Sequence, residues 1–550
     1  MTGRLSKHSG PRMLALGLAL IMALAVPLQG LAVAQDEEPA PLSLSLERAV
    51  RLAFEKNLDI AVIDYNRGIA RENVESAAGA FDMILAIGTP GAQAMIGASG
   101  GGFGGTGVGV GGLGFTGSET PTATDLFGVD SLVSDDYNMQ FNVGQQLPMG
   151  FRYDVAYTAG RNKSNSILNS LNPSWNNNLG AAFTFPILQG RGEEATARQL
   201  LLARQNVSVT EETFRGQVET ILLQVEQAYW ELVFAERTLS VQEQSLQLAE
   251  EQLERTQAQV EVGMVAPVQE TQARAALAQR QSDLIVARNS VETAADQLKS
   301  LLRAEALPDG WDTKIETTDE PDVVLDTVDL NEALRVAMDR RPELAQARAT
   351  IAARAIETEA TRNDMLPQLD LVASVTFNGI GGDLIVRDGF LGPPIEVIPG
   401  GYGDAISQLF TFDYPTWRVG FNFAMPVKNR TAKANYARAT LAEDQASQDM
   451  ERIRQQAILE VRTEARNVEA AAELITATQL ARELAQEQLQ IEQDRFEVGM
   501  STNFEVLQFQ DQLVRAAMAE VRSAIDYRIV LARLARAIGI LPDRYGISIQ

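Results

Sequence analysis

The sequence predicts an α+β membrane protein that combines long coiled-coil-like helices with antiparallel transmembrane β-strands. Three observations carry this prediction. Two stretches of about 70 residues repeat apolar side chains at helical spacing, several shorter segments alternate apolar and polar residues, and both patterns occur twice along the chain. The predicted unit is therefore a helix–strand–strand–helix module written twice.

Composition limits the chemistry that the chain can perform. The 550 residues include no Cys and a single His, so thiolate metal sites, disulfides and Cys nucleophiles are excluded. The formal net charge of −25 argues against nucleic acid as a partner, because phosphates repel an acidic surface. No phosphate loop, paired catalytic carboxylates or metal cluster is evident, so we expect no enzyme activity and no cofactor.

Residues 1–34 are typical of a secretory signal peptide. The apolar run Met13–Val26 is too short to span a bilayer as a helix, and Ala32-Val33-Ala34 fits a cleavage site. Basic residues precede the run: Arg4, Lys7 and Arg12. The alternative is an uncleaved anchor helix. No later stretch is apolar enough for a spanning helix, so insertion into a membrane would require a closed β-barrel.

The internal repeat sets the domain boundaries. Residues 44–61 match 328–345, and 181–198 match 420–438 with Pro186 on Pro426. We therefore predict a first repeat at 35–304, a linker at 305–327 and a second repeat at 328–550. The first repeat has an additional segment that includes the Gly-rich run 97–117, which we interpret as a flexible loop.

The helices follow the same order in both repeats. Each repeat begins with a helix, at about 46–79 and 330–363. A very long helix follows the strands, at about 193–262 and 431–498, and a return helix comes after it, at about 267–303 and 503–538. In the first long helix the apolar spacing of 3 and 4 is carried by Val218, Ile221, Leu222, Val225, Tyr229, Leu232 and Val233. About 70 residues span roughly 100 Å, which favours side-by-side packing of helices over one globular core.

The strand candidates alternate apolar and polar side chains over about ten residues, as in a lipid-facing sheet. They are residues 81–87, 137–146, 151–160, 177–187, 369–378 and 416–425. The turn "QQLPMGF" (145–151) is short, whereas 161–174 and 379–415 are predicted as long loops. A soluble sheet with one buried face would also explain the alternation.

A short turn ends both long helices. Glu-Val-Gly-Met occurs at 261–264 and again at 497–500, where Gly263 and Gly499 fit helix-closing glycines. After the second turn, Thr502 and Glu505 fit a capping box. After the first, Pro267 suits the first helical position, and Gln269 aligns with Glu505.

These features resemble the TolC-type outer-membrane efflux channels. The resemblance covers nearly the whole chain after residue 34 and rests on the duplicated order, on Phe185-Pro186-Ile187 at the first strand-to-helix junction and on the paired Val-Gly-Met turns. It implies a homotrimer whose strands close one barrel in outer-membrane lipid and whose helices form a periplasmic α-barrel. It also implies docking to a periplasmic adaptor and, through it, to an inner-membrane transporter, with export and no catalysis.

One departure concerns the strands. Members of this family supply four strands per protomer, two from each repeat, whereas the first repeat here offers four candidates by itself. Either each protomer contributes six strands to a wider barrel, or the "QQLPMGF" hairpin folds elsewhere. Both alternatives stay open at this point.

The resemblance also suggests functional residues. The adaptor-docking tip would consist of Val262, Gly263, Met264, Val498, Gly499 and Met500. The periplasmic gate candidates are Glu505, Gln508, Glu270 and Asp511. Glu505 fits both a helix cap and a gate, two compatible roles, and ordinary solvated helix positions are the alternative for Glu270 and Asp511.

Two other classes of protein share some of these features. A periplasmic adaptor also has helical hairpins and a secretory signal, but the duplication and the alternating strands argue against it. A secreted coiled-coil structural protein would explain the helices and leave the strands and glycine turns without a role. An outer-membrane channel of a tripartite efflux or type I secretion system explains all of these features.

Overall fold

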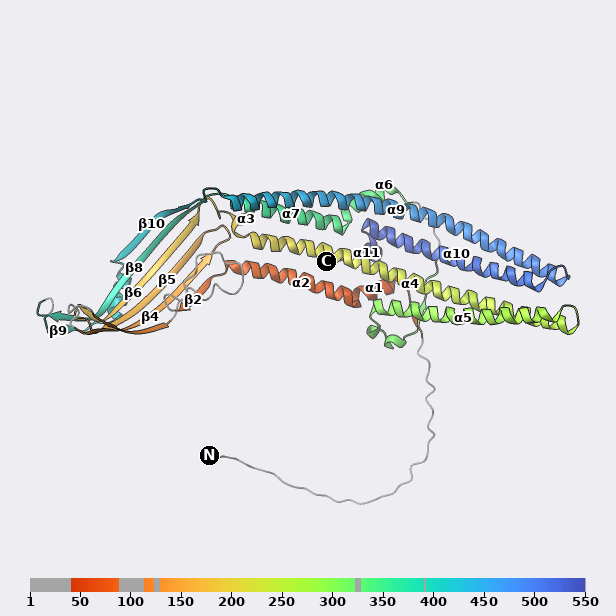
Figure 1. The fold of residues 1–550 in the computed structure, drawn as a ribbon, viewed down its shortest axis with the longest axis horizontal. Coiled ribbons are helices and arrows are strands. Elements are labelled where there is room, and N and C mark those ends of the chain that lie inside the picture. The colour runs from red at the N-terminus through yellow and green to blue at the C-terminus, as the bar shows by residue number, and fades with distance from the viewer. Residues whose placement is uncertain (1–40, 89–112, 123–128, 322–327, 390–391, 550) are drawn as a thin grey trace, which may run out of the picture.

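The computed structural model describes residues 41–88, 113–122, 129–321, 328–389 and 392–549. The molecule is elongated, with one antiparallel sheet at one end and a layer of long helices extending from it (Figure 1). This mixed content confirms the predicted α+β class. The predicted signal peptide lies outside the described residues. None of the helices in the described ranges combines the length and apolar character that a bilayer crossing requires.

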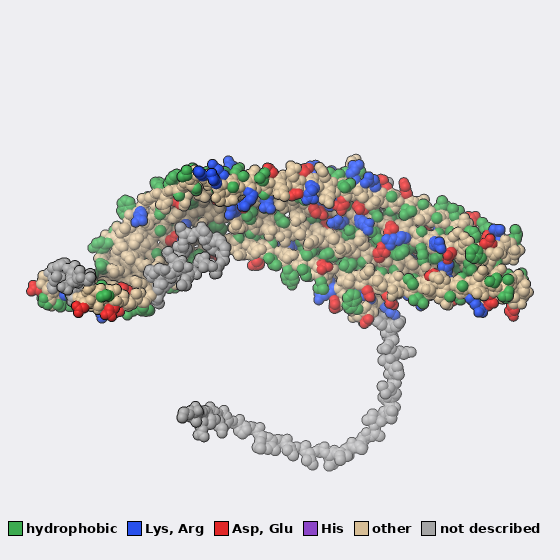
Figure 2. Space-filling model, viewed as in Figure 1, with side chains coloured by type: hydrophobic (Ala, Val, Ile, Leu, Met, Phe, Trp, Pro, Cys, Tyr) green, Lys and Arg blue, Asp and Glu red, His purple; other side chains and the backbone are tan. Residues whose placement is uncertain are grey.

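Two helices run through most of the helical layer. They are α4 (Arg198–Glu261) and α9 (Arg430–Glu497), with 64 and 68 residues, or about 100 Å each. Shorter helices lie beside them: α1 (Leu46–Lys56), α2 (Leu58–Ala78), α3 (Glu193–Thr196), α5 (Pro267–Leu302), α6 (Leu330–Arg340), α7 (Pro342–Asn363), α10 (Asn503–Ile538) and α11 (Leu541–Arg544). The helices α2 and α7 accompany the half nearer the sheet, and α5 and α10 accompany the far half (Figure 1). Acidic and basic side chains are interspersed along the visible face of this layer (Figure 2).

The first helix of each repeat is broken once, where a continuous helix was predicted. Asn57 separates α1 from α2, and its side-chain oxygen accepts hydrogen bonds from the backbone N–H groups of Asp59 (2.8 Å) and Ile60 (3.1 Å). Arg341 separates α6 from α7 and has extended backbone angles, because the residue before Pro342 is forced out of the helical region. Each break ends one helix and starts the next, and both repeats share it.

The main core lies in the middle of the molecule, where α1, α4 and α5 meet the C-terminal segment. All seven periodic residues predicted on α4 are buried there, which confirms the helical pattern. A short parallel ribbon also joins β1 (Leu42–Leu44) to β7 (Ile315–Thr317), and the hydroxyl of Tyr229 donates a hydrogen bond to the Leu44 carbonyl at 3.0 Å. The segment between the repeats is thereby tied to the start of the first repeat.

The large sheet has the order β10-β8-β6-β5-β4-β2, with β3 also on β4 and β9 also on β8. Its strands are β2 (Ile84–Gly88), β3 (Leu113–Pro121), β4 (Ser131–Gln146), β5 (Arg152–Ser164), β6 (Leu171–Pro186), β8 (Gln368–Arg387), β9 (Pro394–Ile398) and β10 (Pro415–Ala424). Because β2 and β3 share one edge of β4, and β9 and β10 share one edge of β8, the described strands occupy six positions across the sheet. The "QQLPMGF" turn joins β4 to β5 within it, so this hairpin belongs to the sheet and does not fold elsewhere.

Three predicted loops contain regular structure. Residues 113–117 of the Gly-rich run belong to β3, while 97–112 lie outside the described residues. The loop predicted at 161–174 is shorter in the structure, because β5 and β6 extend into it from both sides. The predicted loop 379–415 contains the end of β8, then β9 and helix α8 (Tyr402–Thr411). The prediction of a loop here was wrong, because Gly379 allows a helix to pack on the strand. A Cβ at this position would lie 2.1 Å from the Ala405 carbonyl oxygen, so only glycine lets α8 lie this close to β8.

The register separates two faces of the sheet. One cross-strand row is apolar and consists of Val143, Val155, Ala181, Val375 and Trp417. The adjacent row points to the opposite face and consists of Gly144, Asp154, Ala182, Ser374 and Arg418. Since side chains alternate along a strand, the predicted period of two is confirmed across both repeats.

Candidate functional site at the helical tips

The two hairpin turns lie at the end of the molecule opposite the sheet (Figure 1). In the first, the Met264 N–H donates to the Gln259 carbonyl at 2.8 Å, and the Gly263 N–H donates to the Val260 carbonyl at 3.0 Å. In the second, the Met500 and Gly499 N–H groups make the equivalent bonds at the same two distances. This pair of bonds is the Schellman motif, which satisfies the last carbonyls of a helix.

Both glycines are required by backbone conformation. Their φ angles are +76° at Gly263 and +75° at Gly499, a region that side-chain-bearing residues rarely adopt. A Cβ on either would meet no atom within 4 Å, so lack of space is not the reason for glycine. The predicted helix-closing role of both is confirmed.

The remaining tip candidates form exposed apolar patches, one on each turn. Val262 and Met264 are 70% and 71% exposed, and Val498 and Met500 are 70% and 68% exposed. Side chains of this size normally gain by burial, so an exposed patch at the end of a rigid hairpin is typical of a protein interaction surface. The structure therefore leaves all four side chains available to a partner.

The two tips differ in how the return helix begins. The Thr502 hydroxyl accepts a hydrogen bond from the Glu505 N–H at 3.4 Å, and the Glu505 carboxylate accepts one from the Thr502 N–H at 2.9 Å, which confirms the predicted capping box. The Thr502 N–H, followed by the Ser501 and Thr502 hydroxyls, lowers the pKa of Glu505 below its usual value. At the first tip, Ala266 precedes Pro267 and no side chain caps α5.

The gate candidates have separate partners. Glu270 pairs with Arg274 at 2.7 Å, and Asp511 pairs with Arg280 on α5 and with Arg515 at 3.2 Å. Gln508 is exposed on the same helix as Glu505. Across the part of the chain that the structure describes, no hydrogen bond or ion pair joins one gate candidate to another within the protomer.

Asn503 is a tip residue that the sequence did not single out. It is fully buried, and its side-chain oxygen accepts hydrogen bonds from Gln252 at 2.7 Å and Thr256 at 3.5 Å on α4. Its amide nitrogen donates to the Gln269 carbonyl of α5 at 3.3 Å. One side chain thus joins the start of α10 to both helices of the other hairpin. The available signal was weak, because an Asn in the first turn of a helix is ordinary.

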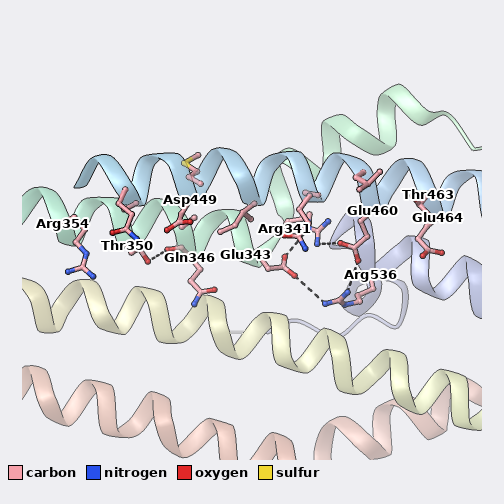
Figure 3. A pocket seen from close by; sticks show the side chains of 18 of the residues that line it. Arg341, Glu343, Gln346, Thr350, Arg354, Asp449, Glu460, Thr463, Glu464 and Arg536 are labelled. Carbon is pink, nitrogen blue, oxygen red and sulfur yellow. Dashed lines mark hydrogen bonds and ion pairs between the residues drawn. The ribbon is translucent and has the colours of Figure 1, made fainter. Parts of the chain in front are cut away.

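A second polar site lies halfway along the molecule. A groove of about 860 Å³ runs between α7 and α9 (Figure 3). At its end the Arg341 guanidinium contacts Glu460 at 2.7 Å and Glu343 at 3.3 Å. Arg536 of α10 contacts the same two carboxylates at 3.1 Å and 3.7 Å (Figure 3). These four residues, the four-residue ion-pair network, connect α7, α9 and α10 where α10 ends and α7 begins.

Glu219 of α4 faces this network. It is 6% exposed, and burial, followed by the negative charge of Glu343, raises its pKa to about 8. Arg536, Arg341 and Arg215 act in the opposite direction. Glu219 is therefore mostly protonated at pH 7, and α4 packs against the network without adding a third negative charge to the half-buried Glu343 and Glu460. Among the described residues, no group of three or more His, Cys, Asp or Glu side chains is arranged to hold a metal ion.

Solved structures define the class of this fold. CusC, a protein whose crystal structures are described in terms of transmembrane channel formation, superposes with a TM-score of 0.62 at 15% identity, covering 91% of this chain and 93% of CusC. The CmeC outer membrane channel of Campylobacter jejuni gives a TM-score of 0.60 at 14% identity, covering 90% of this chain and 86% of CmeC. The fold is thus that of bacterial outer-membrane channels.

Sequence comparison then identifies the family. The profile of the outer membrane efflux protein family matches residues 113–303 and 333–540, and the chain belongs to this family. Outer membrane protein TolC of Escherichia coli (strain K12) is 23% identical over 399 residues, which is 72% of this chain and 75% of TolC. The resemblance inferred from sequence is confirmed, and the chain is an outer-membrane efflux channel with its helices in the periplasm. The family is one of transport channels and not an enzyme family.

Proposed function

We propose that three copies of this chain form one passive conduit from the periplasm to the exterior, with the sheets closed into a transmembrane barrel and the helices into an α-barrel. The observation that carries the proposal is the joining of a two-faced sheet to helices of about 100 Å that end in exposed apolar turns. Such a molecule would reach from the outer membrane far into the periplasm. Passage through its lumen requires neither catalysis nor a cofactor.

The two unpaired edges of the large sheet support the assembly of several copies into one barrel. The outer edge of β10 and the outer edges of β2 and β3 pair with no described strand, and an isolated sheet with two free edges is prone to pair further. Closing the sheet of each copy onto the next removes both edges. With six strand positions per copy, this barrel would be wider than one built from four.

The helical layer also has two complementary flanks. Its order is α2, α4, α7 and α9, so α2 and α9 are the outer helices of the half nearer the sheet. A stripe of exposed apolar side chains follows α2 at helical spacing: Leu58, Val62, Tyr65 and Ile69, which are 54–74% exposed. On α9, Leu441 and Leu459 are 69% and 63% exposed. Packing α2 of one copy against α9 of the next would bury both stripes.

The tip is proposed as the docking site for a periplasmic adaptor, which would connect the channel to an inner-membrane transporter. Val262, Met264, Val498 and Met500 would provide apolar contacts, and Gly263 and Gly499 would keep the turns tight. Whether the system handles small molecules or, as in type I secretion, polypeptides depends on the transporter.

The gate is proposed to lie just inside the tip. Glu505 and Gln508 are exposed on α10, three residues apart on adjacent turns, and would face the entrance. Repeated by threefold symmetry, Glu505 would place a ring of carboxylates there, which favours cations. Asp511, through its ion pair with Arg280, would hold the two hairpins together, and Glu270 would hold α5 beside α4 through the hydrogen bond that it accepts from Gln257 at 3.3 Å.

The test of the conduit has two parts. Purified protein in detergent should have the mass of a trimer and should conduct ions in planar bilayers. A monomer without conductance would refute the proposal.

The test of docking uses charge insertion at the tip. The double substitution Met264→Asp and Met500→Asp should abolish efflux in cells while the trimer yield and bilayer conductance stay unchanged. Leu480→Asp is the matched control, because Leu480 is an exposed apolar residue (55%) on α9, about 27 Å along the helix from the turn. Undiminished efflux by the double variant would remove the tip from the docking surface.

A further inference from the structure

Three basic residues gather where the sheet meets the long helix of the second repeat. Lys428 and Arg430 lie at the junction of β10 and α9, and Lys433 lies in the first turn of α9. All three are exposed. Figure 2 shows Lys and Arg side chains gathered at this junction of the sheet and the helical layer. In a chain with a net charge of −25, this basic turn is unusual.

The basic turn has no acidic partner within the protomer. Among the residues that the structure describes, none of its three cations forms an ion pair with a carboxylate. The matching junction of the first repeat differs, since Arg198 at the start of α4 lies 3.8 Å from both Glu357 and Asp364. The first junction thus leaves one exposed cation, Arg191, without an ion pair to a described carboxylate, whereas the second leaves three.

The position of these charges is unfavourable for the helix that carries them. The N-terminus of a helix has a partial positive charge, so basic side chains there repel it and acidic ones stabilise it. The first turns of α6 and α10 accordingly contain Glu332 and Glu505, whereas the first turn of α9 contains no acidic residue. An external anion would remove this unfavourable interaction.

The basic turn directly follows the apolar end of the sheet. Phe421 and Phe423 are each 66% exposed on β10, and Met425 and Val427 after it are 56% and 96% exposed. Apolar side chains that stop within one residue of a basic cluster are typical of the boundary between a bilayer core and its headgroups. Since the helices lie in the periplasm, this boundary belongs to the periplasmic leaflet of the outer membrane.

We propose that the basic turn binds the phosphate groups of anionic phospholipids in the periplasmic leaflet and so fixes the depth of the channel in the membrane. This inference rests on the proposed lipid-facing orientation of the sheet. Each cation near an anionic bilayer contributes about a fivefold gain in association, so three give roughly a 100-fold preference at low salt. The attraction weakens at high ionic strength because exposed charges are screened.

The test measures lipid binding to the full-length trimer by native mass spectrometry. Phosphatidylglycerol and phosphatidylcholine with the same acyl chains are the probes. The unmodified protein should prefer phosphatidylglycerol, and the triple variant K428Q/R430Q/K433Q should lose that preference at least tenfold. The charge-conserving variant K428R/R430K/K433R should keep it.

A control variant separates local binding from net charge. R452Q/R454Q/R462Q removes three exposed arginines from the same helix, the first of them about 33 Å below the basic turn, and should keep the lipid preference. Equal loss in both triple variants would overturn the proposal, because the effect would then come from net charge. An unchanged preference in K428Q/R430Q/K433Q would also overturn it.

Two other anions could occupy the basic turn. The α2 acids Glu72 and Glu75 of a second copy could pair with it, in which case the triple variant would dissociate into monomers in both lipids. Inorganic phosphate could bind in place of lipid, in which case millimolar phosphate would abolish the preference at constant ionic strength. Either result overturns the lipid assignment. Bilayer conductance of the variant trimer, expected to be unchanged, reports separately on the conduit itself.

Discussion

Replacing Glu219 by Gln should change how the stability of the protein depends on pH. The pKa of Glu219 is about 8 in the folded protein, against an ordinary value of 4.5. Between these two values the folded state holds a proton that the unfolded state has released. Unfolding therefore releases a proton, and the free energy of unfolding falls as pH rises from 4.5 to 8. Gln cannot ionise, so this part of the pH dependence should disappear in the variant.

The size of the effect follows from the shift in pKa. Each unit corresponds to about 1.4 kcal/mol, so the Gln variant should gain about 3 kcal/mol over the unmodified protein at pH 7 and about 4 kcal/mol at pH 8, where half of the folded molecules have lost the proton, with almost no gain at pH 4.5. With an unfolding entropy of about 2.1 cal/mol/K per residue, 1 kcal/mol shifts the Tm of a chain this long by about 1 °C. The expected gain in Tm is therefore about 3 °C at pH 7 and about 4 °C at pH 8.

The assay is thermal unfolding of the detergent-solubilised protein at pH values from 4.5 to 8.5. Glu250→Gln is the matched control, because Glu250 is an exposed residue of the same helix, and its curve should follow that of the unmodified protein. If the Glu219→Gln curve also runs parallel to the unmodified one at every pH, the reasoning is refuted. In that case Glu219 would be ionised in the folded protein and paired with Arg341 or Arg536.

Three further substitutions test the tips. Thr502→Ala removes the cap of α10 and should cost about 0.5–2 kcal/mol of local stability. Hydrogen–deuterium exchange should become faster in the first turn of α10 and stay unchanged at the start of α5. An unchanged exchange rate in the α10 turn would contradict the role of the cap. Asn503→Ala leaves the buried amide of Gln252 without its partner and should cost about 1–3 kcal/mol, with faster exchange in both hairpins; an effect confined to α10 would show that Asn503 does not join them. Asp511→Asn removes the charge that pairs with Arg280 and should raise single-channel conductance in planar bilayers; an unchanged conductance would remove Asp511 from the proposed gate.

Local patterns in the sequence predicted most of the fold. The long helices were predictable because their apolar residues recur at helical spacing without Pro, and the observed bounds of α9, Arg430–Glu497, differ by one residue at each end from the prediction. The closing glycines were predictable because few other residues adopt a positive φ. The break at Arg341 could have been found from Pro342, since a proline restricts the residue before it.

Contacts between distant segments were not predictable in the same way. Helix α8 lies against β8 because Gly379 and Gly381 leave room for it, yet glycines in a sequence first suggest a loop. In the four-residue ion-pair network, Arg341 and Glu343 are two positions apart, but Glu460 and Arg536 come from distant parts of the chain. Nothing in the sequence around Arg341 indicates these two partners. Asn503 is a similar case, because its importance depends on Gln252 and on the Gln269 carbonyl, both more than 200 positions away.

The two repeats share a backbone and differ in the side chains that act on it. Gly263 and Gly499 close their helices with the same hydrogen-bond distances and nearly the same φ, so the duplicated architecture is retained at the tips. The return helices differ, since Thr502 caps α10 and no side chain caps α5. A capping hydrogen bond makes the start of a helix more resistant to fraying. A partner that displaces the first turn of α5 therefore breaks no side-chain cap, whereas at α10 it must break the Thr502 cap. In a ring of identical copies the two kinds of tip would alternate, and an adaptor would meet a firmer and a softer docking site in every protomer.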